Sequence, residues 1–176
     1  MAALGREQRL TLAGMIAAVV VTAATLVLAP PALVALLPVL PGAAERVAFA
    51  ARAELLLALP LALAIAVVAR LRFFSAADIA GAAFTTPTRP VAVANAVLQN
   101  TLEQTALAVP VHLGLAATLA PHQLGAVPAL VALFLVGRLA FAIGYARGAA
   151  ARAFGFALTF YPTLAALGWG IARLIG

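Results

Sequence analysis

Two short polar stretches stand out in an otherwise apolar chain as places where chemistry could occur. The first is Asn100-Thr101-Leu102-Glu103, which lies within the polar run 95–104. On a helix, residues three or four apart lie near one another, so Asn100 and Glu103 are expected to share a face. A carboxylate in apolar surroundings is costly unless it is neutral, paired or in contact with water. This patch is therefore a candidate functional site.

The second stretch runs from 138 to 152 and combines arginine with aromatic residues. Helical spacing would place the following residues on one stripe: Arg138, Phe141, Tyr145, Gly148 and Arg152. Two guanidinium groups with a tyrosine hydroxyl between them can bind carboxylates. Taken alone, Arg147 and Arg152 are also explained as positively charged anchors at the cytoplasmic end of a span.

An ion pair between Glu103 and Arg138 is the simplest link between the two stretches. The two residues are expected at a similar depth on neighbouring helices, so each would neutralise the other. Such a pair can be purely structural, because removal of one partner leaves a buried charge that costs about 3–5 kcal/mol.

The composition indicates an integral membrane protein. Of the 176 residues, 66% are hydrophobic and 9% are charged, whereas soluble domains carry roughly 25% charged residues. All eleven basic residues are arginines, and they are scattered at the ends of apolar segments. We therefore attribute the net charge of +6 to membrane topology and to contact with anionic head groups rather than to nucleic-acid binding.

The residue types exclude several kinds of reaction centre. The chain has no cysteine, its only serine is Ser75, and its two histidines, His112 and His122, are ten residues apart. These types offer no disulfide, no cysteine nucleophile, no serine triad and no cluster of metal ligands. If the protein is an enzyme, we expect its reactive group to come from a bound small molecule.

Five membrane spans are expected, because about 20 apolar residues cross a bilayer. They lie approximately at 9–29, 51–73, 90–119, 123–146 and 149–174. The first resembles a signal peptide but is long enough to be a retained span. Pro30 and Pro31 are expected to end it, and 31–42 is interpreted as a surface-lying or re-entrant connection before a small charged cluster at 45–54.

Arginines near the span ends predict the orientation of the chain. One side receives Arg6, Arg9, Arg70, Arg72, Arg89, Arg147 and Arg152, and the other receives Arg46, Arg52 and Arg173. The richer side is expected to be cytoplasmic, which places the N-terminus inside and the C-terminus outside. Thr88 is expected to cap the helix that follows, with Pro90 in its first turn.

Together the two polar stretches resemble the family of membrane-associated proteins in eicosanoid and glutathione metabolism (MAPEG). This family includes microsomal glutathione transferases and the leukotriene and prostaglandin E synthases. Asn100 and Glu103 match its N-x-x-E motif, and the stretch from Arg138 to Arg152 is similar to its R-x-x-Y-x-x-G-Y-x(6)-R motif. The resemblance covers about 51–174. It divides the chain into an extra N-terminal helix with a proline-rich connection, 1–50, and a four-helix domain, 51–176.

The resemblance implies a homotrimer that holds glutathione in a cytoplasmic-side cleft between subunits, in a bacterial inner membrane. Asn100 and Glu103 would contact the tripeptide, and Arg138 and Tyr145 would complete the pocket. Arg152 would be catalytic, since a guanidinium near a thiol favours the thiolate. The implied activity is a transferase or peroxidase acting on lipophilic electrophiles. Arg70 or Arg72 resemble a basic pair that reaches a neighbouring subunit's site.

Two departures from the family pattern leave other functions open. Ala96 stands where active relatives usually carry an arginine, and Phe141 where many carry a tyrosine. One alternative is a non-catalytic member that keeps a structural Glu103–Arg138 pair and binds no glutathione. Another is a small transporter or channel with this pair as a relay, although neither an inverted repeat nor a ring of acids is visible.

Overall fold

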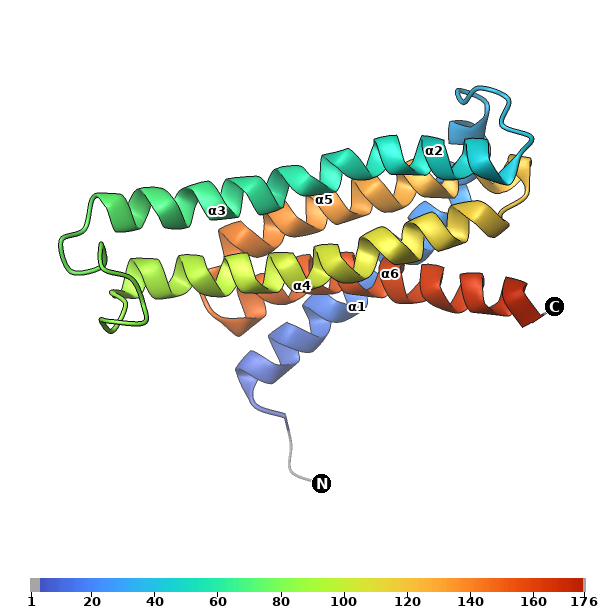
Figure 1. Cartoon of the computed structure of the whole chain (residues 1–176). Coiled ribbons are helices and arrows are strands. Elements are labelled where there is room, and N and C mark those ends of the chain that lie inside the picture. The colour runs from blue at the N-terminus through green and yellow to red at the C-terminus, as the bar shows by residue number, and fades with distance from the viewer. Residues whose placement is uncertain (1–3, 176) are drawn as a thin grey trace.

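The computed structural model describes residues 4–175, and helices are the only regular elements in this range. The six α-helices are α1 (Arg6–Val34), α2 (Ala43–Glu54), α3 (Ala58–Phe73), α4 (Arg89–Thr118), α5 (Ala126–Tyr145) and α6 (Ala149–Ile175). Two short 3₁₀ turns, η1 (Leu55–Leu57) and η2 (Pro121–Gln123), join α2 to α3 and precede α5. The all-α class predicted from the sequence is confirmed (Figure 1).

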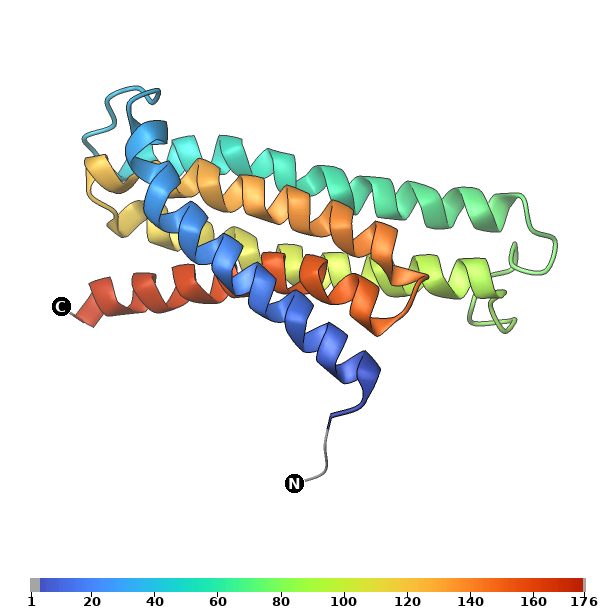
Figure 2. The same cartoon turned by 180° about the vertical axis from the view of Figure 1, so that it is seen from behind.

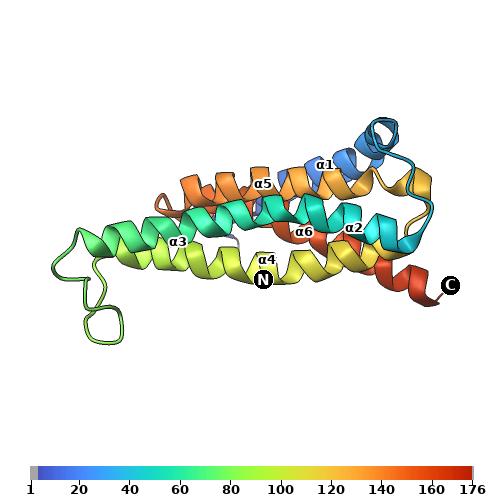
Figure 3. The same cartoon turned by 45° about the horizontal axis from the view of Figure 1, so that its top comes forward.

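Long helices that run side by side form the body of the molecule. Figure 3 shows α2 and α3 end to end alongside α4, and α3 and α4 extend beyond the hairpin between α5 and α6. Among the described residues, four segments are long and apolar enough to cross a membrane: Arg6–Val34, Ala43–Phe73, Pro121–Tyr145 and Ala149–Ile175. α4 has the length of a span, but its polar run lowers its hydropathy.

α1 crosses the bundle diagonally over α6 and α5 (Figure 2). Its contact with α6 is close at Gly14, where a Cβ atom would lie 3.2 Å from the backbone nitrogen of Phe154. The expected stop at Pro30 and Pro31 is wrong, because the helix continues to Val34. Prolines are tolerated here because they lie near the helix end and leave only two carbonyls without their usual N–H donors.

The helix before α3 begins earlier than predicted. The span expected at 51–73 begins at Ala43, so the whole charged cluster at 45–54, and not only its end, lies on a helix, α2. The Glu45 carboxylate accepts a hydrogen bond of 2.9 Å from the backbone N–H of Gly42, which caps the helix start. The 3₁₀ turn η1 interrupts the helix before α3 because Pro60, in the first turn of α3, has no N–H with which to donate the hydrogen bond that a continuous α-helix requires.

Two arginines cover the carbonyl end of α4. The Arg46 Nη2 atom donates to the carbonyl of Ala117 at 3.4 Å, and the Arg173 Nε atom donates to the carbonyl of Thr118 at 2.8 Å. Positive charge is favourable at a helix C-terminus, where carbonyl groups lack intrahelical partners. These contacts fix α4, which carries Asn100 and Glu103, to α2 and α6.

Asp78 organises the connection between α3 and α4. Its carboxylate accepts hydrogen bonds from the Ser75 hydroxyl at 2.5 Å and from the N–H and the hydroxyl of Thr88, both at 2.8 Å. Chiefly the Ser75 hydrogen bond, with those from Thr88, lowers the pKa of Asp78 below its usual value of 3.8. Thr88 is the N-cap residue as predicted, but its hydroxyl binds Asp78 instead of the helix backbone.

Candidate functional site

Arg138 is the central polar residue of the bundle. It lies on α5 and is only 2% exposed. Its Nη1 atom donates to the Asn100 side-chain carbonyl at 2.9 Å, and its Nη2 atom donates to the Thr159 hydroxyl at 3.1 Å. One guanidinium group therefore ties α4 and α6 to α5 and orients the motif asparagine.

Aromatic side chains connect Arg138 to Arg152. The guanidinium of Arg138 lies 4.3 Å from the centre of the Phe141 ring, and that of Arg152 lies 4.4 Å from the centre of the Tyr145 ring. The two rings meet edge to face with centroids 5.3 Å apart. Both contacts are cation–π interactions, which restrain the guanidinium groups without neutralising their charge.

The predicted single stripe from Arg138 to Arg152 is wrong in its geometry. α5 ends at Tyr145, Gly148 takes a positive φ of 111°, and the chain reverses into α6 at Ala149. A glycine tolerates this backbone conformation at little cost. Arg152 consequently returns to Tyr145 from the next helix, so the two residues meet across a hairpin.

Glycines allow α5 and α6 to approach closely enough for these contacts. A Cβ atom on Gly144 would lie 2.2 Å from the carbonyl oxygen of Ala151, and one on Gly155 would lie 2.2 Å from the backbone nitrogen of Phe141. Gly137 faces Thr159 in the same way, at 2.6 Å from its methyl group. This close packing of α5 and α6 places the Thr159 hydroxyl within hydrogen-bond distance of Arg138.

The predicted Glu103–Arg138 ion pair is not formed within the described chain. Glu103 is exposed, and its carboxylate accepts a hydrogen bond from the Gln99 side-chain nitrogen at 2.9 Å. Three residues turn a helix by about 300°, so Asn100 and Glu103 diverge by about 60°. Asn100 faces α5, and Glu103 faces outward beside Gln99. Arg138 accordingly binds Asn100. Neither the Arg138 guanidinium nor the Glu103 carboxylate has a partner of opposite charge within residues 4–175.

The five predicted site residues are thus only partly assembled in one chain. Asn100, Arg138, Tyr145 and Arg152 form one connected series of contacts through Phe141. Glu103 stands apart on the outer face of α4. Arg72 takes part in the α3–α4 connection, where its Nε atom donates to the carbonyl of Asp78 at 3.4 Å.

The sequence interpretation missed a second buried polar pair. His112 on α4 and Glu54 at the end of α2 are 1% and 6% exposed, and their Nδ1 and Oε1 atoms lie 2.9 Å apart. His112 was a lone titratable residue inside an apolar segment, which is the signal that could have identified it, whereas Glu54 belonged to the charged cluster at 45–54. Thr159, which binds Arg138, carried no comparable signal because threonines are common in apolar helices.

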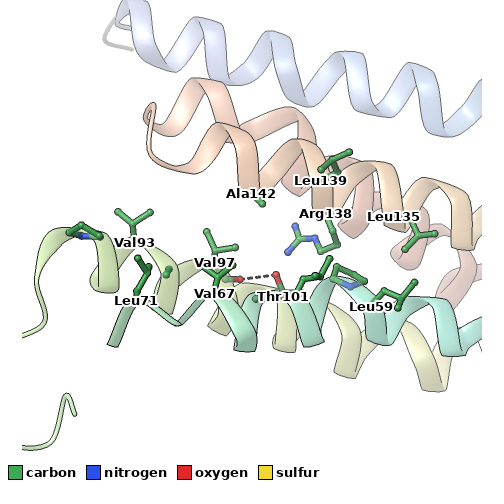
Figure 4. Close-up of a pocket in the computed structure, with 15 residues that line it drawn as sticks. Leu59, Val67, Leu71, Val93, Val97, Thr101, Leu135, Arg138, Leu139 and Ala142 are labelled. Atoms are coloured by element: carbon green, nitrogen blue, oxygen red, sulfur yellow. Dashed lines mark hydrogen bonds between the residues drawn. The ribbon is translucent and has the colours of Figure 1, made fainter. Parts of the chain in front are cut away.

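An apolar groove opens between α3, α4 and α5, with Arg138 in its wall. Its volume is about 450 Å³. Figure 4 shows Arg138 among Val97, Thr101 and Leu139, and the Thr101 hydroxyl donates a 2.7 Å hydrogen bond to the Val97 carbonyl. The remaining walls consist of leucine, valine, alanine and proline side chains.

Comparison with known proteins identifies the family of the chain. The model of the MAPEG family matches residues 47–172, which is most of the chain and leaves α1 outside the matched region. No curated protein and no solved structure matches the chain. On the strength of that match and of a helical bundle suited to a membrane, the chain belongs to the MAPEG family.

Proposed function

We propose that this protein is a multi-pass membrane enzyme that transfers glutathione to lipophilic electrophiles or uses glutathione to reduce them. The observation that carries the proposal is the contact series from Asn100 through Arg138 and Tyr145 to Arg152. It links Asn100 of the first motif to the second motif and ends in the half-buried side chain of Arg152.

The uncompensated charges of the site fit a ligand that carries both signs. Arg152 and Glu103 each lack an oppositely charged partner within residues 4–175. Glutathione has an amino group for a carboxylate such as Glu103 and two carboxylates for guanidinium groups. Asn100 offers its side-chain N–H₂ to such a ligand, because its carbonyl oxygen is already occupied by Arg138.

Arg152 is the proposed catalytic residue, and Tyr145 holds it in place. When bound, glutathione supplies the nucleophilic sulfur that the cysteine-free chain lacks. A guanidinium beside a thiol stabilises the thiolate and lowers the thiol pKa. The Tyr145 ring limits the rotamers of Arg152, so less ordering is required when the thiolate approaches. We assign Arg138 to positioning Asn100 rather than to direct contact with the tripeptide.

The two departures predict weaker binding than in relatives that retain both polar groups. Ala96 lies one turn before Asn100 and offers no guanidinium, and Phe141 places a ring under Arg138 without a hydroxyl. Each lost hydrogen bond to a charged ligand costs about 1–3 kcal/mol. Arg89 is at the start of α4, seven residues or about 10 Å before Ala96, so it cannot replace the missing group in the same chain.

A homotrimer in a bacterial inner membrane, with the N-terminus in the cytoplasm, completes the proposal. Glu103 and Gln99 are exposed on α4, and a carboxylate that faces hydrocarbon is costly. Neighbouring copies of the chain would cover this face and bring Glu103 to a site shared between subunits. The arginine distribution supports the orientation.

A non-catalytic role is the second candidate, and one observation favours it. Arg138 is held by Asn100, Thr159 and Phe141 within its own chain, so the R-x-x-F part of the motif serves the architecture without any ligand. In that case the bundle would keep both motifs as a scaffold and bind no glutathione.

Replacement of Arg152 separates the two candidates. In Arg152→Ala, conjugation of glutathione to chlorodinitrobenzene should fall by tenfold or more, because removal of an electrostatic contact made in the transition state costs about 1.4 kcal/mol or more. Arg147→Ala is the matched control, since Arg147 is an exposed arginine in the same hairpin. Equal activity in the two variants would contradict the catalytic assignment.

A further inference from the structure

We propose that the connection between α3 and α4 docks on the head-group layer of the membrane and binds anionic phospholipids there. The docking surface consists of three exposed apolar side chains and two exposed arginines: Phe74, Ile79, Phe84, Arg70 and Arg89. It lies outside the proposed glutathione site and does not depend on it. The shape of the connection, its depth in the membrane and its charge lead to this proposal.

Hydrogen bonds give the connection a fixed shape. The Asp78 carboxylate binds the Ser75 hydroxyl and both the N–H and the hydroxyl of Thr88, so it closes the turn between the two helices. The Arg72 Nε atom donates to the carbonyl of Asp78 at 3.4 Å. The connection is therefore an ordered turn whose own polar groups hold it together.

The same turn leaves its large apolar side chains uncovered. Phe74, Ile79 and Phe84 are 77%, 56% and 82% exposed, so no part of residues 4–175 shields them. Figure 3 shows the connection extending beyond the α5–α6 hairpin, at the far end of α3 and α4. Exposure of apolar area to water is unfavourable, so these side chains favour an apolar partner.

The length of the preceding span places the connection at the membrane surface. The segment Ala43–Phe73 has 31 residues and is long and apolar enough to cross a membrane. At 1.5 Å per residue it measures about 46 Å, close to the roughly 40–45 Å of a bilayer with its head groups. Its end therefore lies in the head-group layer, where aromatic rings and arginines are favoured.

The charge of the docking surface fits an anionic head group. Arg70 and Arg89 are exposed, and neither forms an ion pair within the described residues. Asp78 is the only acidic residue between positions 55 and 102, and its carboxylate is already engaged in the hydrogen bonds of the turn. Each arginine near an anionic surface strengthens the association by about fivefold.

A second copy of the chain fits the docking surface less well than a lipid layer. The chain has a net charge of +6, and the α5–α6 hairpin adds Arg147 and Arg152 at the same end of the bundle (Figure 1). Another copy would bring this basic end toward Arg70 and Arg89, and like charges repel. Arg72, which could extend toward a neighbouring subunit, is instead folded into its own connection.

A single tryptophan reporter tests the position of the connection in the full-length protein. Trp169 is the only tryptophan, so Trp169→Phe/Phe84→Trp carries one reporter at the docking surface. In vesicles of phosphatidylcholine and phosphatidylglycerol, we expect lipids brominated near the head group to quench it at least about twofold more than lipids brominated deep in the chain. Aqueous acrylamide should quench it weakly.

A reporter inside the span is the matched control. Leu63 on α3 is 66% exposed and lies ten residues, or about 15 Å, before the end of that helix. In Trp169→Phe/Leu63→Trp, we expect the deep bromines to quench more strongly than the shallow ones. The two reporters together distinguish the head-group layer from the hydrocarbon.

Lipid selection tests the arginines. Brominated phosphatidylglycerol among unlabelled phosphatidylcholine is compared with the reverse mixture, and the reporter at position 84 should favour the anionic lipid by about fivefold or more. Arg70→Gln/Arg89→Gln should remove this preference, and Arg70→Lys/Arg89→Lys should retain most of it. Arg6→Gln/Arg9→Gln removes the same charge from exposed positions on α1 and should leave the preference unchanged.

Three results would overturn the proposal. Strong acrylamide quenching without bromine quenching would place the connection in water. Protection of the reporter from both quenchers would show that another copy of the chain covers it. Equal quenching by the two brominated lipids, or an equal preference in Arg70→Gln/Arg89→Gln and Arg6→Gln/Arg9→Gln, would contradict the binding of anionic lipid by the docking surface.

Discussion

At the scale of single residues, the membrane-buried polar groups of this chain are held by neutral partners more than by ion pairs. Arg138 relies on an amide, a hydroxyl and an aromatic ring. The residue types of the site were evident from the sequence, because polar residues are rare in apolar helices. Their partners were not, because a 60° rotation on α4 decides whether Asn100 or Glu103 faces Arg138.

The buried Glu54–His112 contact should be a measurable part of the stability. Glu54→Ala leaves the His112 ring without its partner in a buried site, so the free energy of unfolding should fall by about 1–3 kcal/mol. Denaturant unfolding in detergent micelles would measure the loss. The double variant Glu54→Leu/His112→Leu should recover most of it, because no polar group is then left unpaired. A double variant less stable than the single one would contradict this account.

At the scale of elements, glycines set the distance between α5 and α6, and the hairpin sets their register. The sequence predicted both helices and a break near Gly148, yet it placed Tyr145 and Arg152 on one stripe. Helical periodicity carries no information about residues that meet across a turn, and this is why the prediction of a single stripe was wrong. The same limit hid Thr159, whose role depends on the close approach at Gly137.

Gly155→Ala should separate the two helices and damage the site. Its Cβ atom would meet the backbone of Phe141 and Gly137 at 2.2–2.7 Å, so the helices must move apart at a cost of about 1–3 kcal/mol. Gly168→Ala is the matched control on the same helix, because nothing lies within 4 Å of the added atom. Thermal unfolding of both variants would compare them. Equal stability would show that the close packing of α5 and α6 does not depend on Gly155.

The α3–α4 connection should lose order in acid. Because hydrogen bonds to the carboxylate lower the pKa of Asp78, its contribution to stability is present above the usual value of 3.8 and is lost as pH falls below it. Pepsin cleavage near the exposed Phe84, followed from about pH 5 to pH 2, would report the change. Asp78→Asn should be cleaved readily throughout. The same pH dependence in both proteins would contradict the role of Asp78.

At the scale of the whole molecule, the family bundle is supplemented by α1, which lies across α5 and α6 of its own chain (Figure 2). Composition was sufficient to predict an all-α membrane protein, and motif spacing was sufficient to predict its family. The path of α1 could not be predicted from the sequence, because a uniformly apolar helix has no distinct face that indicates which helix it packs against. The contact depends instead on small residues such as Gly14 and Ala18.

The exposed face of α4 should lie at the interface of the proposed trimer. Because the chain has no cysteine, Ala106→Cys introduces a single thiol one turn after Glu103 on an exposed position. Mild oxidation in detergent should yield disulfide-linked dimers of this variant. Ala66→Cys, exposed on α3, is the control and should remain uncross-linked. Equal cross-linking in both variants, or none in either, would count against an interface at Glu103.

Binding of glutathione to the purified wild-type protein in detergent, measured by calorimetry, tests the central claim most directly. The account predicts saturable heat with a dissociation constant between micromolar and low millimolar, weakened in Glu103→Gln and unchanged in Arg147→Ala. An absence of heat at several millimolar glutathione, with the bundle still folded, would contradict the proposed function and leave both motifs as a structural scaffold.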